Sequence, residues 1–179
     1  MTVTMSLALL VLRLVVGPVL LVHGTQKLFG WFGGPGLTRL MQGFEKQGFK
    51  PVWLWVSLVI LGEVGGGLSA VLGFLTPLGA AGIFGVMFMA TFKSHWKNGF
   101  IVSKGGYEYT LVLMNVSIAL GLIGPGNYSL DALFGIVFPE ALFFGALAVA
   151  ALLVDIIGLY ISRPAAIASS REDVHSSLP

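Results

Sequence analysis

Five stretches of apolar residues run along the chain, separated by glycine, proline and charged residues. They cover residues 5–24, 52–75, 78–92, 109–123 and 140–161. An α-helix rises about 1.5 Å per residue, so roughly 20 residues are needed to cross a hydrocarbon core about 30 Å thick. The first, second and fifth stretches reach this length. The other two are shorter, and we count them as spans on the expectation that their helices extend to Trp96 and start at Glu108, with amphipathic ends in the headgroup region. The pattern predicts an all-α integral membrane protein with five transmembrane helices.

The composition independently favours a membrane protein. Hydrophobic residues make up 56% of the 179 residues, charged residues make up 10%, and the mean hydropathy is +0.91. Soluble domains are about a quarter charged, so this chain has too few charges to cover a soluble globule. The net charge of +2 is too small to suggest nucleic-acid binding. The absence of cysteine excludes disulfides, thiolate chemistry and cysteine-ligated metal centres.

The first apolar stretch is expected to stay in the protein as a transmembrane helix. A signal peptide has basic residues before its apolar core and a small-residue cleavage site after it. Here no basic residue precedes the stretch, Arg13 lies inside it, and the sequence HGTQK follows at 23–27. The pattern therefore predicts a retained span.

Basic residues outside the apolar stretches predict the orientation. With five spans, nine of them fall on one side of the membrane and none on the other; they are Lys27, Arg39, Lys46, Lys50, Lys93, Lys97, Lys104, Arg163 and Arg171. The positive-inside rule makes that side cytoplasmic. We therefore predict a multi-pass protein with its N-terminus outside and its C-terminus inside.

Two segments outside the spans have their own character. Residues 31–50 begin with the turn-rich sequence WFGGPG and continue with apolar residues at helical spacing beside Arg39 and Lys46. This pattern predicts a short helix lying on the membrane interface. Residues 163–179 are rich in serine, alanine and mixed charges, which predicts a disordered cytoplasmic tail.

Three ionisable residues, Arg13, Glu63 and Asp155, lie inside the spans, where each costs a few kcal/mol unless it has a partner or a task. Glu63 lies near the middle of its stretch, and Arg13 lies about 12 Å from the start of its own. Consecutive spans are usually neighbours, so we expect Arg13 and Glu63 to form a buried ion pair or to bind a ligand. A purely structural pair is the alternative. Asp155 is expected to make a polar contact inside the bundle.

A second polar group is expected at the cytoplasmic ends of the spans, because its members share one depth. Its candidate pocket residues are His23, Gln26, Lys27, His95, Glu108 and Asn115. Histidine exchanges protons near neutral pH, so one interpretation is a pocket for a polar headgroup above an aromatic slot. The other is that these residues only anchor helix ends. The chain has no metal, P-loop or dinucleotide motif, so we expect no metal or nucleotide cofactor, and no catalytic residue is assigned.

The order of these motifs resembles the DoxX family of small bacterial membrane proteins, which is related to the DoxD subunit of thiosulfate:quinone oxidoreductase. The matching residues span 7–131; they are Arg13, HGTQKLFG at 23–30, LGE at 61–63, LGFLT at 72–76, residues 87–96, GYEY at 106–109 and GPGNYSLD at 124–131. The resemblance implies an up-and-down four-helix membrane core at 1–131, with residues 132–162 forming an additional transmembrane helix. The chain departs from the family at Pro77, where members often carry arginine.

The resemblance also implies a function in the bacterial cytoplasmic (inner) membrane. It suggests a subunit of a redox or oxidative-stress complex with quinone as its lipid-soluble ligand. Without cysteine, the chain would need a redox protein partner as its electron source. Two other hypotheses stay open: a non-catalytic scaffold that docks cytoplasmic enzymes, and a transporter of a small solute or of protons. A homo-oligomer is compatible with each of them.

Overall fold

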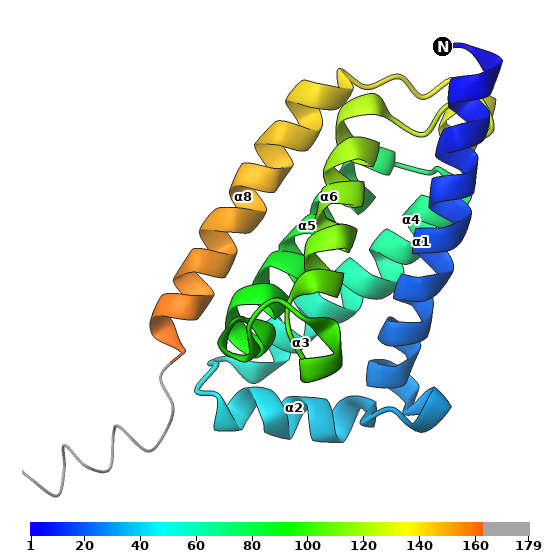
Figure 1. Ribbon diagram of the computed structural model, residues 1–179. Helices are drawn as coiled ribbons and strands as arrows, with labels where there is room; N and C mark the ends of the chain where they lie inside the picture. Colours follow the sequence, from blue (N-terminus) through cyan, green and yellow to red (C-terminus); the bar gives the residue numbers. More distant parts are fainter. Residues whose placement is uncertain (163–179) are drawn as a thin grey trace, which may run out of the picture.

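The computed structural model describes residues 1–162, so the predicted disordered tail at 163–179 lies outside the described residues. All regular secondary structure within the described residues is helical. The long helices stand side by side as a bundle, with α1 and α8 on opposite sides of it (Figure 1). The predicted all-α membrane fold is confirmed.

Within residues 1–162, four helices are long and apolar enough to cross a membrane: Val3–Phe29, Val52–Leu72, Thr76–Asn98 and Glu140–Ile161. The first is α1 and the last is α8. The second comprises α3 (Val52–Ile60), η2 (Leu61–Gly65) and α4 (Gly66–Leu72), and the third comprises α5 (Thr76–Ala90), η3 (Thr91–His95) and η4 (Trp96–Asn98). Shorter elements are η1 (Trp31–Gly33), α2 (Gly36–Lys46), η5 (Val102–Lys104) and α7 (Leu130–Leu133). The chain is a multi-pass membrane protein whose outer surface contacts lipid.

The remaining apolar stretch forms α6 (Glu108–Ile123), which has 16 residues. At about 1.5 Å per residue it is roughly 24 Å long, shorter than a full span. It nevertheless stands among the long helices, where it contacts α5 and α8 (Figure 1). The count of five transmembrane helices therefore stays a prediction.

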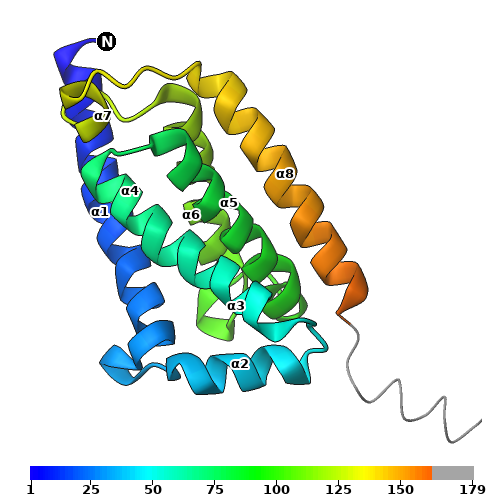
Figure 2. The same ribbon diagram turned by 180° about the vertical axis from the view of Figure 1, so that it is seen from behind.

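Helix α2 lies across one end of the bundle, below the ends of the upright helices (Figures 1 and 2). We call this end the α2 end and the opposite end the far end. Three aromatic rings, tilted to one another, hold α2 in place, because the ring centroids of Phe44 and Phe49 are 5.0 Å apart and those of Phe49 and Trp55 are 5.2 Å apart. Phe49 is fully buried. A helix is thus present within residues 31–50 as predicted, and its placement on a membrane interface stays a prediction.

The far end is closed by the turn between α4 and α5. The carboxylate of Asp131 accepts hydrogen bonds from the backbone N–H groups of Leu75 and Thr76, at 2.8 and 3.1 Å, and from the Thr76 hydroxyl at 3.0 Å. Backbone N–H groups at a helix start lack partners within the helix, and a carboxylate there also complements the helix dipole. Asp131 therefore caps α5 and joins it to the segment that carries α7.

Glycines set the contact between α1 and the second long helix. A methyl group added at Gly17 would lie 2.9 Å from the Gly67 carbonyl oxygen, and one added at Gly24 would lie 2.5 Å from a methyl group of Val64. Only glycine allows the two backbones to approach this closely, as is usual where membrane helices pack. These contacts fix which residues of the two antiparallel helices face each other.

Candidate functional site

Glu63 is a buried acid held by one cation. Glu63 is 2% exposed, and its Oε1 atom forms a salt bridge with Nζ of Lys27 from α1. Its other oxygen, Oε2, is buried without a hydrogen-bond partner among the described residues. Taking a carboxylate out of water costs several kcal/mol, which a close countercharge offsets. Lys27 therefore holds α1 against the second long helix and leaves Oε2 able to accept a further hydrogen bond.

The predicted ion pair between Arg13 and Glu63 is wrong. Arg13 is 1% exposed and donates from Nη2 to the backbone carbonyl of Tyr128, near the far end. The register of the helices explains the difference, because Glu63 faces Gly24 and Arg13 lies three turns earlier on α1, about 16 Å along the axis. Helix α1 also continues to Phe29, beyond the expected end of its span, so depths counted from the ends of the apolar stretches did not match.

Glu63 lies in a wide turn of its helix. Residues Leu61–Gly65 form one π-helical turn between α3 and α4. Such turns are rare and often occur at functional sites. On the other side of the turn, a methyl group at Gly62 would lie 2.8 Å from the Gly82 carbonyl oxygen. The turn thus presents Glu63 to α1 while its glycine packs closely against α5.

His23 lies one helical turn before Lys27 on α1 and meets the start of α6. Its Nε2 atom is 3.5 Å from the hydroxyl oxygen of Tyr109, and the centroids of the two rings are 5.8 Å apart. Sequence reasoning missed Tyr109 and missed Lys27 as the partner of Glu63. The spacing of His23 and Lys27, four residues apart on one helix face, was the signal available for placing them together.

His95 and Glu108 close a loop. The Nδ1 atom of His95 is 2.7 Å from the carbonyl oxygen of Gly105, and the Glu108 carboxylate accepts from the backbone N–H of Val102 at 3.0 Å. Both bonds fold the connection between η4 and α6 back on itself. Sequence spacing did not reveal them, because this connection has no regular pattern. A role of either side chain in ligand binding stays a prediction.

The last two predicted pocket residues, Asn115 and Gln26, make contacts of their own. Asn115 is exposed, and its side chain donates to a carbonyl of the preceding turn at 2.9 Å. Gln26 packs against Gly34, where a methyl group would lie 2.5 Å from its Cβ atom. The structure thus brings His23 and Lys27 to the Glu63 region and places the other predicted pocket residues in local contacts.

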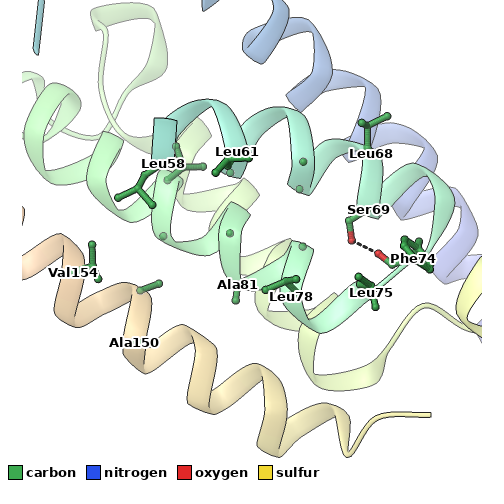
Figure 3. Close-up of a pocket in the computed structure, with 18 of the residues that line it drawn as sticks. Leu58, Leu61, Leu68, Ser69, Phe74, Leu75, Leu78, Ala81, Ala150 and Val154 are labelled. Carbon is green, nitrogen blue, oxygen red and sulfur yellow. Dashed lines mark hydrogen bonds between the residues drawn. The ribbon is translucent and has the colours of Figure 1, made fainter. Parts of the chain in front are cut away.

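A large apolar groove lies on another side of the bundle, between the second long helix, α5 and α8 (Figure 3). It has a volume of about 720 Å³. Leucines from α3 and α4 face Ala81 of α5 across it, and Ala150 and Val154 of α8 form a further wall (Figure 3). Ligand pockets have roughly 300 to 1,000 Å³ and mostly apolar walls. We call this feature the apolar groove.

Asp155 supplies the free polar group of the apolar groove. The groove is lined by only two residues with polar side chains, Ser69 and Asp155. The Ser69 hydroxyl donates to the Phe74 carbonyl at 2.7 Å, as Figure 3 shows, so it is satisfied. Asp155 is 8% exposed, and its buried Oδ2 atom has no hydrogen-bond partner among residues 1–162. Its Oδ2 atom would lie 3.6 Å from a methyl group at Gly85, an ordinary contact distance, so Asp155 faces α5 at this position.

The comparison with known proteins identifies the family. Residues 8–96 match the DoxX family model. The chain belongs to the DoxX family. It is also similar to the inner membrane protein YqjF of Escherichia coli (strain K12), with 29% identity over 128 residues, which cover 72% of this chain and 92% of that protein. No solved structure matches the chain.

Some of the site residues lie within the segment that matches the DoxX model, and others follow it in the sequence. Arg13, Lys27 and Glu63 lie within it, as do the groove walls formed by α4 and α5. Tyr109 and Asp155 follow the matched residues. The family-matched part of this DoxX protein thus provides the buried ion pair and most of the apolar groove, whereas α8 adds the acid.

Proposed function

We propose that this DoxX protein is a membrane subunit of a redox or oxidative-stress complex in the bacterial inner membrane, and that it binds a quinone in the apolar groove. The observation that carries the proposal is Asp155, a buried acid whose Oδ2 atom has no partner within the described part of the chain, in a largely apolar cavity of about 720 Å³. A quinone combines an apolar ring and isoprenoid tail with two carbonyl oxygens. Such a ligand needs apolar walls and a small number of polar contacts, and the groove offers both.

Asp155 would perform the polar part of the chemistry. As a carboxylic acid it donates a hydrogen bond to a quinone carbonyl oxygen, and as a carboxylate it accepts one from a quinol hydroxyl group. Reduction of a quinone to a quinol consumes two electrons and two protons, and Asp155 is positioned to pass on one proton at a time. The chain has no cysteine, so we propose that a redox protein partner supplies the electrons.

Binding of short-tailed menaquinone and ubiquinone analogues to the protein in lipid nanodiscs tests the proposal, with affinity measured by calorimetry. We expect saturable binding to the wild type. Gly65→Leu should weaken it at least about tenfold, because Gly65 lines the groove, and the space beside it is open, so the leucine would fill the cavity. Asp155→Leu should weaken it about 10- to 100-fold by removing a hydrogen bond from a buried acid.

The matched control is Gly145→Leu, a helical glycine that also has open space beside it but does not line the groove. This variant should bind the quinone as the wild type does. Equal affinities for wild type, Gly65→Leu and Asp155→Leu would contradict the proposal. If the wild type bound no quinone but captured cytoplasmic enzymes, the scaffold would be favoured, and solute or proton flux into liposomes would favour the transporter.

A further inference from the structure

A second cavity lies between α2 and the helices that α2 crosses, and Lys27 of the ion pair is one of the residues that line it. It has a volume of about 260 Å³ and is enclosed by α2 together with parts of α1, α3, α5 and η3. We call it the α2 cavity. It shares no lining residue with the apolar groove except Val86. It is therefore a separate candidate site, independent of the quinone proposal.

Three cations from three separate elements line the α2 cavity: Lys27 of α1, Arg39 of α2 and Lys93 of η3. No acidic residue is among the residues that line it. Lys27 is neutralised by Glu63, whereas Arg39 forms no salt bridge within residues 1–162. Three cations against one acid leave an excess of positive charge at the cavity, which favours an anionic occupant.

Lys93 is held in place by uncharged groups. Its Nζ atom donates to the Ser162 hydroxyl at 2.6 Å, and it lies 3.5 Å from the carbonyl oxygen of Gln47. Nζ also lies 4.7 Å from the centroid of the Phe49 ring, an arrangement that attracts a cation to the ring face. All of these partners are uncharged. Lys93 is thus a positioned cation whose charge is available to a ligand.

Apart from Gln47 and Ser94, the residues that line the rest of the α2 cavity are apolar. Its other walls include Phe44, Phe49, Val59, Val86 and Met89. A site with cations on one part of its lining and hydrocarbon on another suits an amphiphile rather than a fully polar anion. The cavity also lies at the end of the bundle that carries α2 and the basic connections (Figure 2). Basic pockets at the ends of membrane helices are where lipid phosphates bind.

We propose that the α2 cavity binds the phosphate of an anionic phospholipid headgroup. Arg39 and Lys93 contact the phosphate oxygens, and the start of an acyl chain lies along the apolar walls. Arginine suits this task because its planar fork of N–H groups matches phosphate oxygens. Bound lipid would join α2 to η3 across the cavity and so stabilise the α2 end of the protein.

Native mass spectrometry of the full chain in detergent tests this proposal by titration with phosphatidylglycerol and, separately, with phosphatidylcholine. We expect phosphatidylglycerol to bind at least about tenfold more tightly, and Arg39→Gln with Lys93→Gln to abolish that preference. The matched control is Lys46→Gln with Lys97→Gln, which removes the same charge from residues that do not line the cavity. The control should keep the preference. Arg39→Gln alone, at an exposed position, should lower it without affecting folding.

Three results would overturn the proposal. The first is equal affinity for the two lipids. The second is an equal loss of preference in both double variants, which would indicate general surface charge instead of the α2 cavity. The third is displacement of phosphatidylglycerol by millimolar inorganic phosphate, which would assign the site to free phosphate. Phosphatidylglycerol binding that resists inorganic phosphate supports the lipid.

Discussion

Replacing Lys27 with methionine is expected to destabilise the protein by about 3 to 5 kcal/mol, because it leaves Glu63 buried without a countercharge. Glu63 is 2% exposed, and its only salt bridge within residues 1–162 is to Lys27. A further change of Glu63→Gln should recover most of the loss, since a neutral amide tolerates burial far better than an ion. The measurement is the free energy of unfolding in mixed micelles, followed by helical circular dichroism.

The control for this prediction is Lys46→Met, which removes an exposed cation at the end of α2. It should change the unfolding free energy by less than about 0.5 kcal/mol. The wild type, Lys27→Met, Glu63→Gln and the double variant together form a cycle that measures the coupling energy of Lys27 and Glu63. If Lys27→Met had the unfolding free energy of the wild type, or if adding Glu63→Gln recovered none of the loss, the pair would not hold the helices together.

The second large effect is expected at Gly73, where Gly73→Ala should cost about 3 kcal/mol of unfolding free energy. Gly73 has a φ of +60°, which is unfavourable for alanine by about 1 to 2 kcal/mol. Its new methyl group would also overlap with Nη1 of Arg13 and would lie 2.5 Å from Cβ of Ser129. Arg13 is 1% exposed, so it has little room to move away from the methyl group. The overpacking therefore adds roughly 1 to 3 kcal/mol to the backbone cost.

A glycine at the same end separates the two causes of this effect. Gly135 has a φ of +65°, and a methyl group there would meet nothing within 4 Å. Gly135→Ala therefore carries the backbone cost alone, and we expect a loss of about 1 kcal/mol. If thermal and chemical unfolding gave the same loss for Gly73→Ala as for Gly135→Ala, the tight contact with Arg13 would be refuted.

The apolar stretches predicted the membrane helices well, because a span must bury its backbone polar groups within itself and so leaves a long apolar signal. The signal is weaker at helix ends. Helix α1 reaches Phe29, beyond the end of its apolar stretch, and this extension carries Lys27 to Glu63. Polar residues at a helix end look the same in the sequence whether they belong to the helix or to the loop. The sequence therefore did not show that Lys27 belongs to α1, and it favoured Arg13 as the partner of Glu63.

The candidate site was harder to predict because its residues come together only through packing. The groove takes Gly65 and Ala81 from helices close in sequence but Asp155 from α8, and no spacing rule connects α8 to the others. The π-helical turn at Glu63 also left no sequence mark beyond its neighbouring glycines. The surplus of glycine in the second and third long helices was the available signal, since glycine leaves space between helices as well as allowing close packing.

Photoaffinity labelling tests the central claim, that a quinone occupies the apolar groove beside Asp155, most directly. The protein in nanodiscs would be irradiated with a short-tailed quinone that carries a photoreactive group, and the labelled peptides would be identified by mass spectrometry. The account predicts labels in α4, α5 and α8 that disappear with excess unlabelled quinone and in Gly65→Leu, but remain in Gly145→Leu. Labels concentrated around His23 and Tyr109, or labels that excess quinone does not remove, would contradict it.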